Sequence, residues 1–180
     1  MAQINVEFEL LKHIYMLSPV KVMVLKTVPS IPVLGSNLQK GSEEKMPRFI
    51  AEVLEKLGYV EILEKAPSPQ DLTKMRFAHT QQRSTLVKLD DFFYIIVRDT
   101  ITKLEEKARK DIDITLIKIV DRAKEDFNEI FNLRLAVILR ALQFRNLESV
   151  VKSLSIEEKT MAVDIQKLLE SWIRQFLISK

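Results

Sequence analysis

The chain has 180 residues, of which 47% are hydrophobic and 29% are charged, a composition typical of a folded globular protein and not of a disordered one. It contains no cysteine, which excludes disulfides, thiolate zinc sites and cysteine nucleophiles. The net charge of +3 is too small for a dedicated nucleic-acid-binding protein, so we expect weak or no direct DNA binding.

The N-terminal segment does not have the pattern of an export signal. Its apolar residues Ile4, Val6 and Phe8 are interrupted by Glu7 and Glu9, whereas a signal peptide needs an unbroken apolar stretch. No segment approaches the ~18 uncharged apolar residues that a membrane-spanning helix requires. We therefore expect a cytoplasmic protein that does not associate with membranes.

The distribution of glycine and proline divides the chain. All three glycines and all six prolines lie before residue 70. Because these residues form turns and interrupt helices, the first part should be rich in turns and the second free to be helical throughout. We predict an α+β protein with a small β-rich module and one short helix at residues 1–66. An all-helical domain of four or five helices should follow at residues 67–180.

The first module is predicted to combine strands with a short helix. Residues 20–28 are β-branched and alternate, which indicates a half-buried strand. Pro47 suits the first turn of a helix that Gly58 should end, and residues 59–63 indicate a second strand. Residues 4–17 fit either a strand or a helix.

The second module carries several signals for helix starts. Ser68, Asp90 and Ser155 are placed to cap helices, and the glutamate three residues after Ser155 completes the spacing of a capping box. Apolar periodicity predicts two further helices, through residues 116–130 and 135–142.

We find no pattern typical of catalysis, of a cofactor site or of a metal site. Residues 35–42 contain glycine, lysine and serine, but in the wrong order for a phosphate-binding loop, which favours a plain turn. The only histidines, His13 and His79, lie in different modules. Acidic residues such as Asp111 and Asp113 are interpreted as structural. We expect a protein that is not an enzyme.

Charges in residues 103–124 alternate in sign, which favours a solvated helix face over a path for nucleic acid. The alternative is a small helical DNA-binding transcription regulator with a helix-turn-helix. The absence of glycine after residue 58 argues against the sharp turn that such a motif contains.

The last predicted helix has an apolar stripe wider than one core contact requires. Such a face must be buried on two sides or be covered in part by another subunit. We therefore assign Trp172, Ile173, Phe176 and Leu177 as candidate subunit-interface residues. A fully internal core helix is the competing interpretation, and the sequence leaves both open.

Several local motifs follow one another in a recognisable order. After the strand at residues 20–28 come Lys40-Gly41 followed by acids, and then Met46-Pro47-Arg48-Phe49-Ile50-Ala51 ahead of the stop at Gly58. Residues 86–94 and 154–158 look like the starts of a long helix and of a last one. In this order the chain resembles a GINS subunit, of the family that accompanies the replicative MCM helicase. It departs from the family at Ser42, where an acid is commoner, and at residues 30–39, which have no distinctive match.

The resemblance implies an architecture and partners, but no active site. Two GINS subunit types are permuted versions of each other, and this chain is similar to the archaeal type whose strand module comes first. It implies a non-catalytic scaffold subunit of the GINS DNA replication complex, in a hetero-tetramer with the permuted subunit. It also implies binding to the MCM helicase and to a RecJ-like protein at replication forks.

Overall fold

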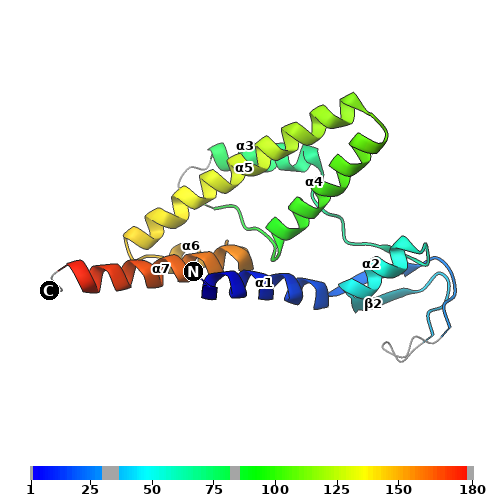
Figure 1. Cartoon of the computed structure of the whole chain (residues 1–180), viewed down its shortest axis with the longest axis horizontal. Helices are drawn as coiled ribbons and strands as arrows, with labels where there is room; N and C mark the ends of the chain where they lie inside the picture. The colour runs from blue at the N-terminus through cyan, green and yellow to red at the C-terminus, as the bar shows by residue number, and fades with distance from the viewer. Residues whose placement is uncertain (1, 30–36, 82–85, 178–180) are drawn as a thin grey trace. The chain divides into compact units, whose positions relative to one another are not determined.

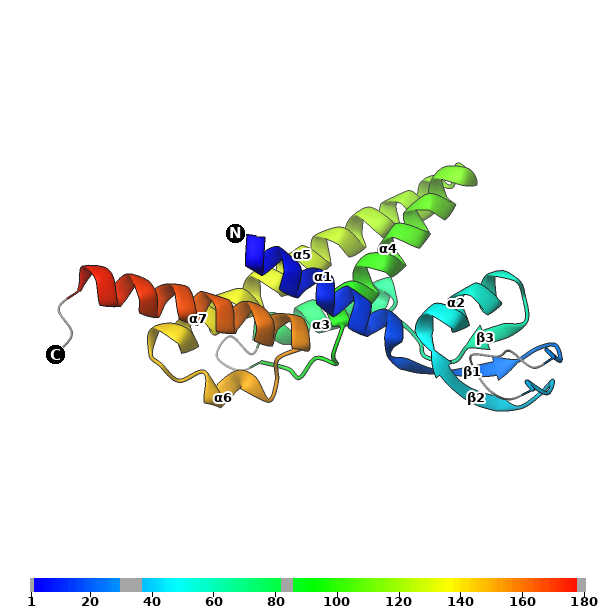
Figure 2. The same ribbon diagram turned by 60° about the horizontal axis from the view of Figure 1, so that its bottom comes forward.

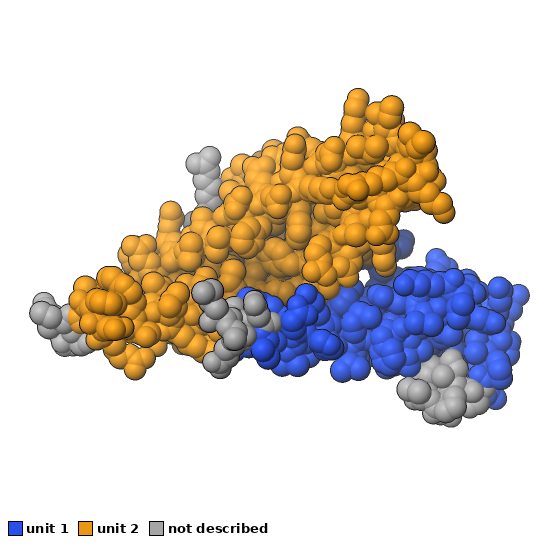
Figure 3. All heavy atoms as spheres, viewed as in Figure 1, with its two compact units in different colours: residues 1–65 blue, residues 66–180 orange. Residues whose placement is uncertain are grey.

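The structure is a computed structural model that describes residues 2–29, 37–81 and 86–177, with side chains from Val6 onward. Over these ranges it combines helices with one three-stranded antiparallel sheet, which confirms the predicted α+β class. The chain forms two compact units, residues 1–65 and 66–180, which are coloured separately in Figure 3. Each unit has its own apolar core.

Unit 1 opens with a helix, α1 (Ala2–Leu17), which settles the ambiguity over residues 4–17. Leu11 and Tyr15 lie one turn apart and are both buried. The Arg48 guanidinium lies over the Tyr15 ring at 4.4 Å from its centroid, a cation–π contact that joins α1 to the next helix.

The sheet has the order β2-β1-β3 and is built from β1 (Pro19–Val24), β2 (Glu43–Pro47) and β3 (Val60–Ile62). The central strand β1 is shorter than predicted, and its alternating valines Val20, Val22 and Val24 are fully buried. Sequence patterning missed β2, because this edge strand is mostly charged and buries only Met46. Charge and proline on an edge strand protect it from pairing with another chain.

Helix α2 (Arg48–Lys56) lies against the sheet, as Figure 2 shows. Pro47 occupies the N-cap position, one residue before the first helical turn where it was expected. Gly58 ends the helix with φ of 71°, which confirms the predicted stop. The predicted turn at residues 35–42 lies partly outside the described residues.

Unit 2 is helical, with α3 (Pro69–Gln81), α4 (Phe93–Lys110), α5 (Ile114–Gln143), the short α6 (Glu148–Val151) and α7 (Ile156–Phe176). The two helices predicted at residues 116–130 and 135–142 are one continuous helix, α5, because no glycine or proline interrupts the chain there. Helices α4 and α5 run antiparallel (Figure 1), and α3 packs against α5. No helix in the described ranges is both long and apolar enough to cross a membrane.

Two apolar clusters hold unit 2 together. The larger joins α3, α4 and the first half of α5 through Leu72, Leu89, Phe93, Val97, Ile101, Val120, Ala123 and Ile130. The smaller joins the second half of α5 to the start of α7 through Ile138, Leu142, Leu154 and Ala162. The long helix α5 therefore connects both clusters.

Two of the three predicted helix caps are confirmed, and one is wrong. The Ser68 hydroxyl accepts from the Asp71 amide at the start of α3, and the Ser155–Glu158 capping box is complete, which confirms both predictions. The cap predicted at Asp90 is wrong. Helix α4 begins only at Phe93, and a carboxylate oxygen of Glu157 accepts from the amides of its residues Tyr94 and Ile95, at 3.0 and 3.3 Å.

Candidate interaction surfaces of the helical unit

Helix α7 changes character halfway along its length. Its first half packs into the smaller cluster, where Ala162 is fully buried. Its second half is open: Leu168 is 70%, Trp172 53% and Phe176 63% exposed. These last turns extend past the end of α5 in both ribbon views (Figures 1 and 2). For this half of the helix, the interpretation as an internal core helix is wrong.

The apolar residues of α7 follow a heptad spacing. Intervals of three and four residues separate Ala162, Ile165, Leu169, Trp172 and Phe176, which places them along one seam of the helix. The Trp172 and Phe176 rings contact each other with centroids 5.4 Å apart. The seam is buried within the chain at Ala162 and exposed at Phe176. The exposed apolar residues therefore lie on the same side of α7 as the buried ones.

The other predicted interface residues lie beside this seam. Ile173 is half-buried, and Leu177 is the C-cap residue of α7 and is exposed. The four predicted residues therefore come together on the last two turns of one helix. The predicted interface residues are therefore apolar side chains that the described part of the chain leaves exposed or half-buried.

A buried ion pair fixes the start of α7 on α5. Arg134 donates from Nε to Glu158 Oε1 at 2.6 Å and from Nη2 to Glu158 Oε2 at 2.7 Å. It also donates to the carbonyl oxygens of Val87 and Ser153, and its Nη1 lies 3.5 Å from His79 Nε2. An arginine has five N–H donors, and each has an acceptor here, which is what a buried guanidinium requires.

Two uncharged side chains, Tyr94 and His79, complete the hydrogen-bond network around Arg134 and Glu158. The Tyr94 hydroxyl donates to Glu158 Oε1 at 2.8 Å, and burial together with that carboxylate raises the pKa of Tyr94 above its usual range. Burial, followed by the positive charge of Arg134, lowers the pKa of His79 to about 4, although Glu158 opposes this shift. His79 is therefore neutral near pH 7 and presents Nε2 as an acceptor to Arg134.

Arg134 was not predicted from the sequence, although a signal was present. Arg134 lies four residues after Ile130 and four before Ile138, so it interrupts a buried apolar stripe of α5 with a charge. A charged residue at such a position needs a buried partner. The identity of that partner, Glu158 on another helix, is not encoded in the local pattern.

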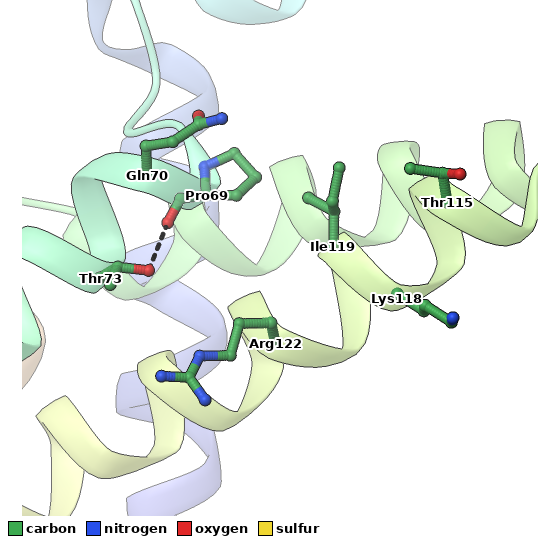
Figure 4. A pocket seen from close by; sticks show the side chains of 7 residues that line it. All are labelled: Pro69, Gln70, Thr73, Thr115, Lys118, Ile119 and Arg122. Atoms are coloured by element: carbon green, nitrogen blue, oxygen red, sulfur yellow. Dashed lines mark hydrogen bonds between the residues drawn. The ribbon is translucent and has the colours of Figure 1, made fainter.

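A pocket of about 450 Å³ lies between the start of α3 and the first half of α5 (Figure 4). Its lining residues are Pro69, Gln70, Thr73, Thr115, Lys118, Ile119 and Arg122. The Thr73 hydroxyl donates to Asp126 Oδ2 at 2.5 Å, and Arg122 Nε lies 3.4 Å from Asp126 Oδ1. The lining set contains neither a histidine nor a carboxylate, and its charged members are Lys118 and Arg122.

The residues considered for chemistry are divided between the two units or have structural roles. His13 is exposed on α1 in unit 1, whereas His79 is buried in unit 2. Asp113 caps α5 by accepting from the amides of Thr115 and Leu116, as its structural interpretation predicts. Among the described residues, no three His, Asp or Glu side chains are placed to hold a metal ion.

Comparisons with known proteins add no assignment. No protein-family model matches the chain, and no curated protein sequence matches it. The features that bear on function are therefore its own: a small sheet unit followed by a helical unit, and an apolar helix end exposed on the latter.

Proposed function

We propose that this chain is a non-catalytic scaffold subunit of a GINS-type DNA replication complex that binds and activates the MCM replicative helicase. The order of the units supports this proposal, because a strand-containing unit precedes a helical one. The local motifs support it too. Lys40-Gly41 forms the turn before β2, with Gly41 at φ of 86°, and residues 47–51 open α2.

The observation that carries the proposal is the exposed second half of α7. A seam containing Trp172 and Phe176 is buried at one end and open at the other, so an apolar partner surface would complete it. The partner in the proposal is the permuted GINS subunit, whose own helical part would extend the bundle into a hetero-tetramer.

Activation of the helicase by such a complex would operate through binding alone. A scaffold changes the population of an active helicase conformation if it binds that conformation more tightly than the inactive one. The proposal therefore requires no nucleophile, metal or cofactor on this chain. A RecJ-like protein is the second proposed partner, at replication forks.

Co-expression with the permuted subunit tests the proposal. We expect the two chains to co-purify as a tetramer in native mass measurement, and the tetramer to bind the MCM helicase and stimulate its unwinding of forked DNA. A chain that stays monomeric beside the permuted subunit would contradict the proposal. Tight sequence-specific DNA binding at physiological salt would instead favour the transcription-regulator alternative.

A further inference from the structure

The turn between α4 and α5 contains a strained isoleucine. The Asp113 amide donates to the Ala108 carbonyl at 3.0 Å and the Ile112 amide to that of Arg109 at 3.4 Å, the hydrogen-bond pattern of a Schellman motif. Ile112 occupies the position after the helix that usually holds glycine, with φ of 51°. A β-branched residue rarely adopts this left-handed conformation, because its side chain crowds the backbone.

The side chain of Ile112 does not offset this strain by packing within the chain. Ile112 is 81% exposed, the highest value of any large hydrophobic residue in the described ranges. Ile114, two residues later at the start of α5, is 67% exposed. The turn therefore presents apolar side chains to solvent at the end of the helix pair, at a position where glycine would relieve the strain.

Residues 107–118 carry four basic side chains against two acidic ones, Asp111 and Asp113, which leaves an excess of positive charge around these isoleucines. Lys107 and Lys110 lie in the last turn of α4 and Lys118 in the second turn of α5, and none of them has an ion-pair partner in the part of the chain that the structure describes. The carboxylate of Asp113 is already engaged by two amides of α5. We call residues 107–118 the α4–α5 tip.

We infer that the α4–α5 tip docks into a partner protein, with Ile112 and Ile114 entering an apolar hollow whose rim carries aspartate and glutamate. The lysines match an acidic rim by charge complementarity, and the isoleucines match an apolar floor. A phosphate backbone offers no apolar hollow for the exposed side chains of Ile112 and Ile114, so these residues favour a protein partner over a nucleic acid.

The inference deepens the proposed function and rests on it, because that function supplies the MCM helicase as the protein on which to test the tip. Strained residues that the fold does not need are found at functional sites, where binding retains them. A partner contact at Ile112 accounts for both its exposure and its unfavourable backbone conformation.

The decisive variant is Ile112→Gly in the assembled complex. Glycine tolerates φ of 51° and removes the apolar side chain, so we expect the melting temperature to rise while affinity for the helicase falls at least tenfold. Arg145→Gly is the matched control. Arg145 ends α5 with φ of 53° and the same pair of hydrogen bonds, so this variant should raise the melting temperature without changing affinity.

Each result decides between the two proposals. Unchanged helicase affinity of Ile112→Gly, beside a wild-type complex that binds, overturns the docking role of the tip and leaves the proposed function standing. A wild-type complex that does not bind the helicase overturns both.

The charge-reversal variant Lys107→Glu/Lys110→Glu should slow association with the helicase, most strongly at low salt. If Ile112→Gly instead weakens binding to forked DNA or to anionic phosphatidylserine vesicles, the assignment to a protein partner is wrong.

Discussion

Arg134 and Glu158 form the most consequential contact between single residues in the helical unit. Their carboxylate–guanidinium pair is fully buried, with every donor of the arginine satisfied. Loss of one partner leaves a charge without compensation in an apolar interior. We expect Glu158→Ala to lower the free energy of unfolding by about 3–5 kcal/mol, as measured by denaturant titration.

The neighbouring Glu157 provides the control for this variant. It caps α4 by accepting hydrogen bonds from two backbone amides. Within the part of the chain that the structure describes, it forms no hydrogen bond with Arg134. Loss of a helix cap costs about 1 kcal/mol, so Glu157→Ala should destabilise the fold much less. Equal effects of the two substitutions would show that the ion pair contributes no more than a cap.

We expect His79 to make the free energy of unfolding depend on pH. Its pKa is lowered to about 4 in the folded chain, against an ordinary value of 6.5 when unfolded. Below pH 6.5 the unfolded chain therefore binds a proton that the folded chain does not. We expect the free energy of unfolding to fall between pH 6.5 and pH 4 by up to about 3 kcal/mol from this residue alone.

His79→Gln isolates that contribution. Glutamine retains an acceptor for Arg134 but does not titrate, so the difference in unfolding free energy between variant and wild type should vary across pH 6.5 to 4. The same variant should show a constant difference above pH 7. A difference independent of pH over the whole range would mean that His79 takes up its proton in the folded chain as readily as in the unfolded one.

At the level of helices and strands, prediction succeeded where the signal is local. Ser68 and the Ser155–Glu158 box cap the helices they precede, because cap and amide lie within three residues of each other. The start of α4 was misplaced because its cap, Glu157, is more than sixty residues away in sequence. A pattern in one segment cannot report a partner that only the tertiary fold brings near.

The tight turns show a second limit of local patterns. The lack of glycine after residue 58 argued against a sharp turn between helices, yet Ile112 and Arg145 both adopt positive φ and end helices there. Glycine is the favoured residue for this conformation, but tertiary packing of the two helices can impose it on others. The presence of a helix is therefore easier to predict from the sequence than the conformation of the turn that joins it to the next helix.

The exposed end of α7 gives the test of the proposed interface. If Phe176 is buried between subunits, an aspartate there would leave an unpaired charge in an apolar contact. We expect Phe176→Asp to dissociate the complex in light-scattering measurements while the helix content in circular dichroism stays unchanged. Gln175→Asp, which adds the same charge to the adjacent exposed residue, should leave the complex intact. Unfolding of the chain by Phe176→Asp would contradict the proposed role, because it would show that Phe176 stabilises the fold of the chain and not only the complex.

At the scale of the whole molecule, composition alone indicated two kinds of architecture. The confinement of glycine and proline to the first seventy residues anticipates a turn-rich unit and a helical one, because it limits where chain reversals form at low cost. The candidate interface was assigned from a pattern of the same kind and stays a prediction. An apolar stripe too wide for one contact is visible in sequence, but whether it is covered from within or from outside depends on helix packing.

The two units should divide the work of the proposed complex. The buried half of α7 contacts α5 within unit 2, and the exposed half belongs to the same helix, so we expect assembly to need only the helical unit. We expect deletion of residues 1–64 to leave a smaller tetramer with the permuted subunit, as measured by native mass. This tetramer should retain the helix content of unit 2 but bind the helicase or the RecJ-like protein less tightly. A truncated chain that folds but does not assemble would place part of the interface on unit 1, and one that stimulates the helicase fully would leave unit 1 without a role in it.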